Sequence, residues 1–318
     1  MSLEEEIVTG PCLAALVAAL ALFPATPPQE DEGWVTHRVE ISPARAIVAR
    51  GSMHAEKGTS WLVFHDARTG LESRRIRFGG PIRDLSFSAD GALLAASRDR
   101  GGVALFDTRT GNAVRELGGH EGWVFAVSLS PDGRLVASAG KDRTLLVRDA
   151  ASGEERLGKT LDRYVGRLAF RPGRPELVVA LHHGALDLVM LEGRTTTLAE
   201  AIPVTSDMAV SADGRWLATL HSSGELRLFD LDSVAGNAEK WRVKAHEEKG
   251  LAVAFSRSGE LVAASGGDRA LRVFSRENGA RAFERKSRRP LLALGDDGNT
   301  IVGADYDGGV ERFAWPER

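Results

Sequence analysis

Residues 119–149 read Gly-His-Glu-Gly-Trp-Val-Phe-Ala-Val-Ser-Leu-Ser-Pro-Asp-Gly-Arg-Leu-Val-Ala-Ser-Ala-Gly-Lys-Asp-Arg-Thr-Leu-Leu-Val-Arg-Asp. An apolar pair, Val127 and Leu129, precedes the Ser-Pro-Asp-Gly turn of this stretch. Equivalent pairs recur along the chain, and their first members are 39 to 46 residues apart. The seven pairs are Val39/Ile41, Leu85/Phe87, Val127/Leu129, Leu168/Phe170, Met208/Val210, Val253/Phe255 and Leu292/Leu294. A period of about 42 residues is typical of the four-stranded blades of a propeller, so the sequence predicts seven blades.

The remainder of each unit repeats as well. Turn sequences such as Ser88-Ala-Asp-Gly91 follow the pairs, and Asp-Gly between apolar runs is a strong hairpin signal. A strand of small residues comes next, as in 135–139, and a more polar fourth strand such as 113–117 ends the unit. The third strand ends in Phe at Phe64, Phe106, Phe229, Phe274 and Phe313. Short apolar runs at this spacing predict an all-β chain of antiparallel four-stranded blades.

These residues carry a resemblance to the WD-repeat β-propeller family over about residues 32–318. The Gly119-His120 pair, the Ser-Pro-Asp-Gly turn and the Asp142-Arg-Thr144 turn are its most specific parts. The resemblance implies a single seven-bladed propeller. The Trp-Asp pair that names the family is Arg148-Asp149 in the third unit and Phe-Asp in the second and fifth units.

The resemblance also implies a hydrogen-bonded network that links the Gly-His histidine, a strand Ser or Thr, the turn Asp and the signature Trp. The third unit keeps His120, Ser138 and Asp142, with Arg148 in place of Trp. The sixth unit keeps His246 and Asp268, but it has Ala264 and Phe274 at the other two positions. The fourth and fifth units lack the turn Asp, which is replaced by Gly184 and Ser223. We therefore expect a partial network, with Phe packing providing most of the cohesion between blades.

Composition excludes several classes of function. The 41 basic and 44 acidic residues give a formal net charge of −3, without the basic footprint of a nucleic-acid-binding protein. A single cysteine, Cys12, excludes an intrachain disulfide framework and a cysteine-based zinc site. The rich use of Ala, Arg and Gly is typical of a bacterial, GC-rich source. We expect a monomer without a cofactor or a bound metal.

Residues 1–31 do not belong to the repeat. An apolar run over residues 12–23 is followed by a Pro-rich linker, and twelve residues are too few to span a bilayer. The run could close the ring as a strand at 17–23 or 5–9, pack as a helix over 13–22, or act within 12–25 as a leader. Glutamates before the run and Phe23 near the candidate cleavage site argue against a leader. We expect a cytoplasmic protein with no membrane association, and an exported or membrane-anchored one if residues 12–25 act as a signal or anchor.

Two sets of residues could support chemistry. His182 and His221 end the second strands of neighbouring units, with His183 adjacent, and imidazoles are common metal ligands. Four carboxylates lie in the turns after second strands and could form a ring that binds calcium or serves a propeller enzyme. They are Asp99, Asp142, Asp268 and Asp307. The simpler interpretation is that the histidines lie at blade edges and that each Asp caps its own turn. The sequence shows no recognised catalytic motif.

A stronger functional signal lies in the connections that lead into first strands. In the resembled family, these connections gather on the usual partner-binding face. Seven residues at such places are candidates for a protein interface: Trp34, Arg83, Trp123, Arg163, Tyr164, Arg288 and Arg289. Trp, Tyr and Arg dominate interface hot spots, although aromatic rings also suit blade cores.

The sequence therefore predicts a non-catalytic scaffold that presents a rigid propeller face to an unidentified partner protein. Two alternatives remain open. One is a propeller enzyme or ligand binder that uses convergent carboxylates or histidines in the central channel, which the sequence does not display. The other is a secreted or membrane-tethered propeller in a cell-envelope assembly.

Overall fold

The computed structural model describes residues 34–54, 57–99, 101–233 and 238–316, and every regular element in these ranges is a β-strand. The chain divides into two units, Met1–Asp31 and Glu32–Arg318, and the second contains the repeats. The expectations for residues 1–31 (a ring-closing strand, a helix or a leader) lie outside the described residues. No helix in the described part of the chain has the length and apolarity needed to cross a bilayer.

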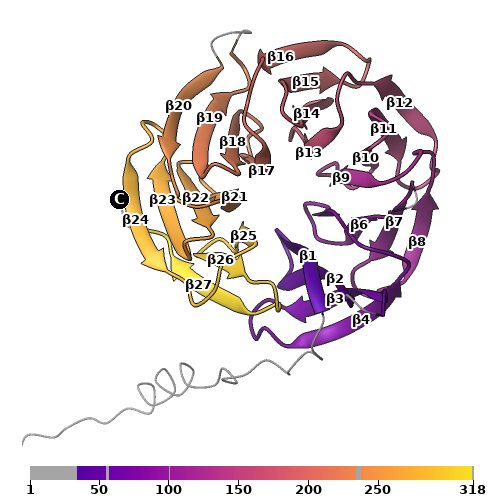
Figure 1. Ribbon diagram of the computed structural model, residues 1–318, viewed down its shortest axis with the longest axis horizontal. Coiled ribbons are helices and arrows are strands. Elements are labelled where there is room, and N and C mark those ends of the chain that lie inside the picture. The colour runs from indigo at the N-terminus through magenta and orange to yellow at the C-terminus, as the bar shows by residue number, and fades with distance from the viewer. Residues whose placement is uncertain (1–33, 55–56, 100, 234–237, 317–318) are drawn as a thin grey trace, which may run out of the picture. The chain divides into compact units, whose positions relative to one another are not determined.

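The strands form seven antiparallel sheets arranged as blades around a central opening (Figure 1). Blades 1 and 2 comprise β1 (Trp34–Ile41), β2 (Ile47–His54), β3 (Ser60–Asp66), β4 (Glu72–Phe78), β5 (Leu85–Phe87), β6 (Leu93–Ser97), β7 (Val103–Asp107) and β8 (Ala113–Leu117). Blades 3 and 4 comprise β9 (Val124–Leu129), β10 (Leu135–Gly140), β11 (Thr144–Asp149), β12 (Glu155–Thr160), β13 (Val165–Phe170), β14 (Glu176–Leu181), β15 (Leu186–Met190) and β16 (Thr195–Ala199).

Blades 5 and 6 comprise β17 (Thr205–Val210), β18 (Trp216–His221), β19 (Glu225–Asp230), β20 (Glu239–Lys244), β21 (Gly250–Phe255), β22 (Leu261–Gly266), β23 (Ala270–Ser275) and β24 (Arg281–Lys286). Blade 7 comprises β25 (Ala293–Asp296), β26 (Thr300–Ala304) and β27 (Val310–Ala314). Six sheets have four strands and that of blade 7 has three within the described residues. The predicted seven-bladed, all-β propeller is confirmed.

The turn between the first and second strands of a blade shows why the repeated sequence folds in this way. In blade 3, the Ser130 hydroxyl donates to Asp132 Oδ1 (2.6 Å), and the Leu135 amide donates to Ser130 Oγ (2.9 Å). Gly133 has φ = 69°, a conformation that favours glycine. Ser88 and Asp90 make the same hydroxyl–carboxylate bond in blade 2. Each Ser-x-Asp-Gly turn is thus a self-contained hydrogen-bonded unit.

Seven apolar clusters hold the ring together, one at each contact between neighbouring blades. Phe64 and Phe106 lie in the cluster between blades 1 and 2, and Phe229 and Phe274 lie in those between blades 4 and 5 and between blades 5 and 6. The buried cluster between blades 2 and 3 is built from Val, Leu and Ala alone. The expectation that Phe packing dominates is therefore wrong at that contact, where aliphatic side chains fill the space.

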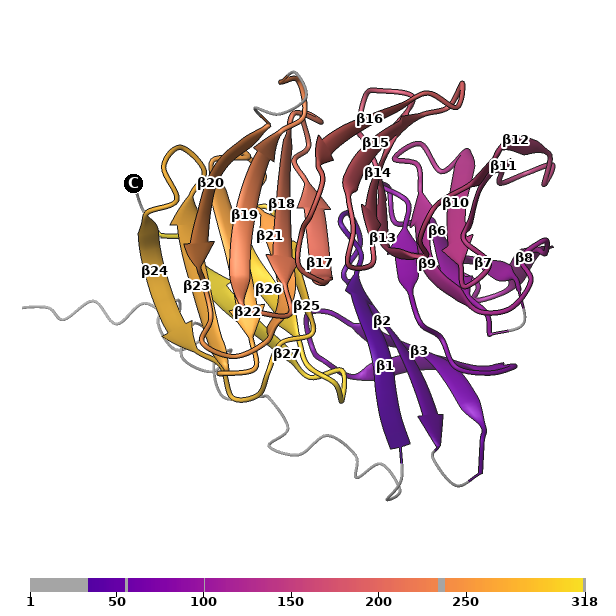
Figure 2. The ribbon, with the colours of Figure 1, turned by 45° about the horizontal axis from the view of Figure 1, so that its top comes forward.

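Blade 7 meets blade 1 through the last of these clusters. Val39 and Val48 from blade 1 pack there with Ala293 and Ala304 from blade 7. A Cβ added to Gly295 would lie 3.1 Å from Ile41 Cγ2, so β25 and β1 approach closely. Figure 2 shows blades 1 and 7 side by side, as Figure 1 does. In the described residues, side-chain packing closes the ring even though blade 7 has three strands.

Candidate functional site: an aromatic row at the rim of the channel

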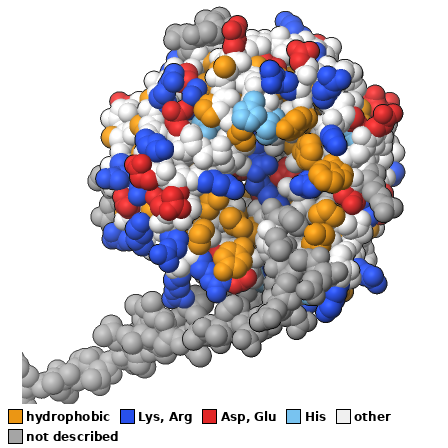
Figure 3. Space-filling view, viewed as in Figure 1, with side chains coloured by type: hydrophobic (Ala, Val, Ile, Leu, Met, Phe, Trp, Pro, Cys, Tyr) orange, Lys and Arg blue, Asp and Glu red, His pale blue; other side chains and the backbone are white. Residues whose placement is uncertain are grey.

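Strand alternation brings two kinds of connection to one face of the ring. The connections into first strands, such as β8–β9, lie at the same end of the blades as the turns between second and third strands, such as β10–β11. In Figure 3, hydrophobic and histidine side chains gather around the central hollow, with Lys and Arg beside them.

Five rings from blades 3 and 4 form a continuous series on this face. The ring of Trp123 contacts that of Phe125 edge-on, with centroids 6.2 Å apart, and Phe125 lies 5.5 Å from Tyr164. Tyr164 stacks on His182 at 4.5 Å, and His182 meets His183 edge-on at 4.5 Å. We call Trp123, Phe125, Tyr164, His182 and His183 the aromatic row. Offset and edge-on ring contacts are the favourable geometries for aromatic pairs, so the row is a cohesive surface.

Cations border the row at its Trp123 end. The Arg83 guanidinium carbon lies 4.1 Å from the Trp123 ring centroid and 5.7 Å from that of Phe125. Lys141 Nζ lies 5.9 Å from the same Trp123 centroid. Even so, 43% of the Trp123 surface and 37% of the Tyr164 surface stay exposed. Burial, together with the neighbouring His183, lowers the pKa of His182, which favours its neutral form at neutral pH.

Backbone hydrogen bonds fix the positions of these side chains. The Ser97 hydroxyl oxygen accepts the amides of Arg83 and Asp84 at 3.0 and 2.9 Å. The Trp123 carbonyl accepts the Lys141 amide at 2.8 Å, and the Tyr164 carbonyl accepts the His182 amide at 3.0 Å. The row is therefore mounted on turns that are themselves tied to the blades.

The other predicted interface residues lie elsewhere or are less involved. Arg163 is exposed beside Tyr164, with its aliphatic stem against Gly184. Arg289 lies 5.0 Å from the Tyr306 ring and forms an ion pair with Asp307, whereas the amide of exposed Arg288 donates to Glu311 Oε1 (2.8 Å). The structure thus joins Arg83, Trp123 and Tyr164 into one site and places Arg288 and Arg289 on blade 7, outside the row.

Trp34 differs from its predicted position. It lies within β1, where its backbone pairs with His54, rather than in a connection before the strand. β1 and β2 are each eight residues long and pair along their whole length, so β1 extends further before the apolar pair than the sequence indicates. The Trp34 side chain lies outside the described residues.

A hydrogen-bonded network supports the row from within blade 3. His120 Nε2 lies 2.9 Å from Ser138 Oγ, and His120 Nδ1 lies 3.1 Å from Asp142 Oδ2. Asp142 also accepts the amides of Glu121 (2.9 Å) and Thr144 (3.1 Å). Burial lowers the pKa of His120, against the opposing effect of Asp142, so the imidazole is held neutral. The network fixes residues 120–121, which lead directly into Trp123.

Blade 6 has a related but incomplete arrangement. His246 Nδ1 lies 3.0 Å from Asp268 Oδ1, and Arg272 donates to Asp268 Oδ2 at 2.6 Å. Ala264 occupies the place of Ser138, since both residues pair with the apolar anchor of their first strand. His246 Nε2 is buried without a hydrogen-bond partner in the described residues.

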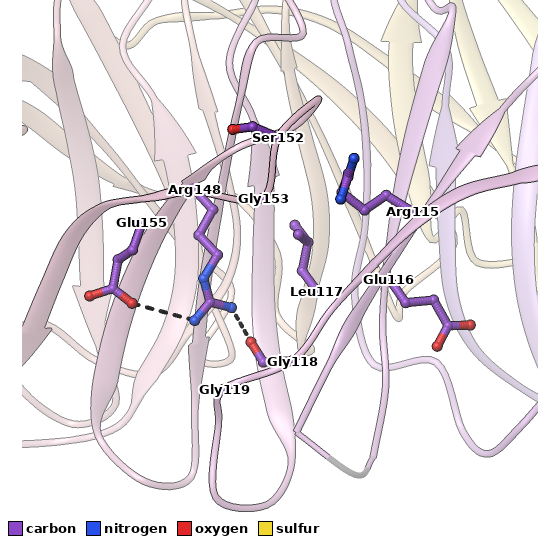
Figure 4. A pocket seen from close by; sticks show the side chains of 9 residues that line it. All are labelled: Arg115, Glu116, Leu117, Gly118, Gly119, Arg148, Ser152, Gly153 and Glu155. Atoms are coloured by element: carbon purple, nitrogen blue, oxygen red, sulfur yellow. Dashed lines mark hydrogen bonds and ion pairs between the residues drawn. The ribbon is translucent and has the colours of Figure 1, made fainter.

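Arg148, which stands where the signature Trp is expected, borders a shallow cavity of about 470 Å³ between blades 2 and 3 (Figure 4). Its guanidinium donates to the Gly118 carbonyl and to Glu155. Figure 4 shows Arg148 pointing from β11 toward the Gly118 backbone, with Arg115 across the cavity. The guanidinium thus ties the connection before His120 to blade 3 by polar contacts.

The central channel contains an ion cluster that sequence reasoning did not find. Arg38 Nε lies 3.1 Å from Asp84 Oδ1, and the Arg38 terminal nitrogen lies 3.3 Å from Glu40 and 3.4 Å from Asp207. Arg167 Nε lies 3.8 Å from Asp207 Oδ1. We call these five residues the channel cluster. Carboxylates therefore do converge on the axis, contrary to expectation, but Arg38 and Arg167 lie among them.

The channel cluster also joins blades through their backbones. Asp84 Oδ2 accepts the Val127 amide of blade 3 (2.9 Å), and Asp207 Oδ2 accepts the Val253 amide of blade 6 (3.0 Å). Burial raises the pKa of Glu40 to about 8, opposed by Arg38 and reinforced by Asp207 and Asp84. Burial and the nearby Arg38 lower the pKa of Arg167. The cluster links blades on opposite sides of the channel.

The residues considered as metal ligands have other roles. His221 is fully buried, 3.0 Å from Thr219 Oγ1 and 3.1 Å from the Pro203 carbonyl, whereas His182 stacks on Tyr164. Asp142 and Asp268 accept amides of their own turns, and Asp307 pairs with Arg289. A Cβ added to Gly80 would lie 2.5 Å from Asp99 Oδ1, so this carboxylate packs on the preceding connection. Within the described ranges, no group of three or more His, Cys, Asp or Glu could hold a metal ion.

Two signals in the sequence could have revealed more of the site. The residue before the apolar pair is charged in four of the seven units, as Arg38, Asp84, Arg167 and Asp207, and these four belong to the channel cluster. Opposite charges at equivalent positions of a ring indicate contact across it. Phe125 and Lys141, which border Trp123, lie two residues after it and in the neighbouring turn.

Comparisons with known proteins agree with this architecture. The family described as WD domain, G-beta repeat matches residues 111–149 and 239–275. A WD repeat-containing protein of Schistosoma mansoni is 42% identical over 119 residues, 37% of this chain and 38% of the relative. The small ribosomal subunit protein RACK1z of Arabidopsis thaliana is 41% identical over 68 residues, 21% of each chain. The nuclear distribution protein PAC1 of Coccidioides posadasii is 46% identical over 62 residues, 20% of this chain and 13% of the relative.

The chain spans well under half the length of these relatives. The matched stretches include blades 3 and 6, which are the two blades that keep both the Gly-His or Ala-His histidine and the turn Asp. The family model matches two of the repeats, and together with the ring of seven antiparallel blades these matches support a WD-repeat β-propeller.

Proposed function

We propose that this propeller is a non-catalytic scaffold that binds a partner protein through the aromatic row. The observation that supports the proposal is the continuous series of rings from Trp123 to His183, with Arg83 stacked at one end. Interface hot spots are enriched in Trp, Tyr and Arg, and they bind best when neighbouring contacts hold them in place. The row meets both conditions, because its members are partly exposed and fixed by backbone hydrogen bonds.

The relatives support the same type of function. By its name, the Arabidopsis protein is a component of a ribosomal subunit, which is a large assembly. The channel, where a propeller enzyme would place its reacting groups, contains carboxylates that already contact Arg38 and Arg167. Asp84 and Asp207 each contact Arg38 and also accept a backbone amide of another blade, so the channel cluster suits a structural role better than a catalytic one.

Affinity purification with quantitative mass spectrometry tests the proposal. The tagged full-length chain is compared with the double variant Trp123→Ala/Tyr164→Ala in cells of the source organism. The matched control is Leu71→Ala/Val114→Ala, which removes two apolar side chains that are each 51% exposed and lie outside the row. We expect the first double variant to lose a specific protein partner that the control retains. Equal recovery of every partner by the wild type and both variants, at unchanged melting temperature, would show that the row is not the interface.

A further inference from the structure

The chemistry of the row's border points to the kind of partner that it fits. Three cations lie along it: Arg83 and Lys141 close to the Trp123 ring, and Arg163 beside Tyr164. Among the described residues, none of the three forms an ion pair with a carboxylate. Two exposed acidic residues of the same connections, Glu121 and Asp162, likewise make no ion pair in this part of the chain. The side-chain carboxylate nearest to Trp123 along the β10–β11 turn, Asp142, is occupied by His120 and two amides.

Arg83 is the most informative of these cations. Its guanidinium carbon lies 4.1 Å from the centroid of the Trp123 ring, in a half-buried position, and its Nε is buried without a hydrogen-bond partner in the described residues. Two other arginines on this face that contact an aromatic ring have a counter-ion. Arg98 lies 4.7 Å from the Phe78 ring and pairs with Glu116 at 2.7 Å, and Arg289 pairs with Asp307. A half-buried guanidinium that lies over an aromatic ring and has no carboxylate within ion-pair distance favours an incoming anion.

We propose that the aromatic row binds a short acidic segment of a partner protein. Carboxylates of the segment pair with Arg83, Lys141 and Arg163, and an apolar or aromatic side chain between them packs on Trp123 and Tyr164. Charge complementarity of this type selects the partner and speeds its encounter, while the ring contacts provide most of the affinity. The inference rests on the proposed scaffold function and adds the chemical class of the partner.

Selection from a phage-displayed random dodecapeptide library tests the inference, because such a selection does not require an identified partner. The bait is the full chain, and the counter-bait is the triple variant Arg83→Gln/Lys141→Gln/Arg163→Gln. We expect the wild type to enrich peptides that contain several Asp or Glu residues around an apolar residue. The triple variant should not enrich them, and the matched control Arg288→Gln/Arg289→Gln should enrich them like the wild type.

Binding of one enriched peptide, labelled with fluorescein, gives the quantitative test. We expect the triple variant to bind it at least tenfold more weakly than the wild type. The single variant Arg83→Lys, which keeps the charge, should bind it more weakly than the wild type but more tightly than the triple variant. Melting temperatures within a few degrees of the wild type exclude misfolding as the cause. Replacement of the peptide's Asp and Glu by Asn and Gln should weaken binding by a similar factor, and added salt should do so progressively.

Three results would overturn the inference. The first is enrichment of neutral or basic peptides, and the second is equal affinity of the wild type and the triple variant for the labelled peptide. The third is tighter binding of a labelled thymidine 20-mer than of any enriched peptide, which would assign the cations to nucleic acid. If Trp123→Ala/Tyr164→Ala loses the cellular partner while the triple variant keeps it, the scaffold function stands and the acidic segment is wrong. If neither variant loses it, the row is not the interface, and both the proposed interface and the acidic segment are wrong.

Discussion

On the face that contains the connections into first strands, blades 2–4 form one part, the first rim, and blade 7 forms another, the second rim. Both rims contain an arginine that contacts an aromatic ring, but the surroundings of that pair differ. In both, an arginine lies over an aromatic ring that is 43% exposed: Arg83 over Trp123, and Arg289 over Tyr306. Arg289 has a counter-ion in Asp307, whereas Arg83 has none among the described residues. Tyr306 has no ring neighbour in the described part of the chain, but Trp123 begins a row of five.

The difference teaches that position in the repeat does not define a binding site. Arg83 and Arg289 occupy equivalent connections, and sequence alone treats them as equal candidates. The turns after the second strands separate them: in blade 7 Asp307 pairs with Arg289, whereas in blade 2 the equivalent Asp99 packs against Gly80. Lys141, from the same turn of blade 3, adds a second cation beside Trp123. The arginine of blade 7 is therefore already neutralised, whereas the cations at blades 2–4 can still accept an anion.

The largest expected effect comes from removal of the ring at the start of the row. Trp123→Ala should weaken binding of the recovered partner about 100-fold, because a hot-spot Trp contributes about 2–4 kcal/mol. Tyr306→Ala should change the affinity less than about threefold. Isothermal titration calorimetry with the purified partner measures both dissociation constants. Similar losses for the two variants would remove the distinction between the rims.

A substitution that makes the first rim resemble the second should have the next largest effect. Lys141→Glu places a carboxylate beside Trp123, where it can neutralise Arg83 and repel an acidic partner. We expect about a thirtyfold loss of affinity, compared with a smaller loss for Lys141→Gln, which removes charge without reversing it. The same titrations at two salt concentrations check the electrostatic origin. An unchanged affinity for Lys141→Glu would show that charge at this rim is irrelevant.

The networks below the rims predict a difference in stability. Ser138→Ala leaves the buried Nε2 of His120 without its partner and should lower the free energy of unfolding by about 1–2 kcal/mol. In blade 6, Ala264→Ser supplies the missing partner to His246 and should raise it by up to about 1 kcal/mol. Urea unfolding of the three proteins measures both changes. If both substitutions shift stability in the same direction, the histidine networks do not work as described.

The smallest effect concerns the channel between the rims. At the position before the apolar pair, blade 2 has the charged Asp84 and blade 7 has the apolar Leu291, and the charged groups of blades 1, 2, 4 and 5 meet in the channel cluster. The pKa of Glu40 is raised from 4.5 to about 8, so the folded state keeps a proton that the unfolded chain releases. This contribution to stability is complete below pH 4.5 and is lost as the pH rises through 8.

Glu40→Gln should therefore flatten the decline of the melting temperature between about pH 5 and pH 9. We expect a difference of only about 2–4 °C, because 31% of the Glu40 side chain remains in contact with solvent. Thermal unfolding followed by circular dichroism at pH 5, 7 and 9 provides the measurement. A wild-type decline that persists unchanged in Glu40→Gln would assign it to other groups.

Much of the fold was predictable because its signals are local. The second strand 93–97 and the fourth strand 113–117 are found at the predicted residues as β6 and β8, since each is bounded by its own turn sequence. The site was less predictable. Trp123, Tyr164 and Arg83 were candidates because of their connections, but their contact depends on how neighbouring blades pack. Phe125 and Lys141 were missed because their only signal is closeness to Trp123 in the repeat, and an alternating strand and a polar turn both use such residues routinely.

The sequence by itself determined seven blades, their antiparallel order and the places where turns occur, because periodicity and turn chemistry act over a few residues. Only the tertiary structure decided which turns meet. Arg38 contacts Asp207 across 169 residues, and Phe125 contacts Tyr164 from the next blade, once the ring is closed. The physical reason is that rings and charges interact over about 4–6 Å in space, a distance that no local pattern encodes. Closure of the ring thus made two equivalent connections different. The one at blades 2–4 joins cations to the aromatic row, whereas Arg289 of blade 7 is neutralised by Asp307.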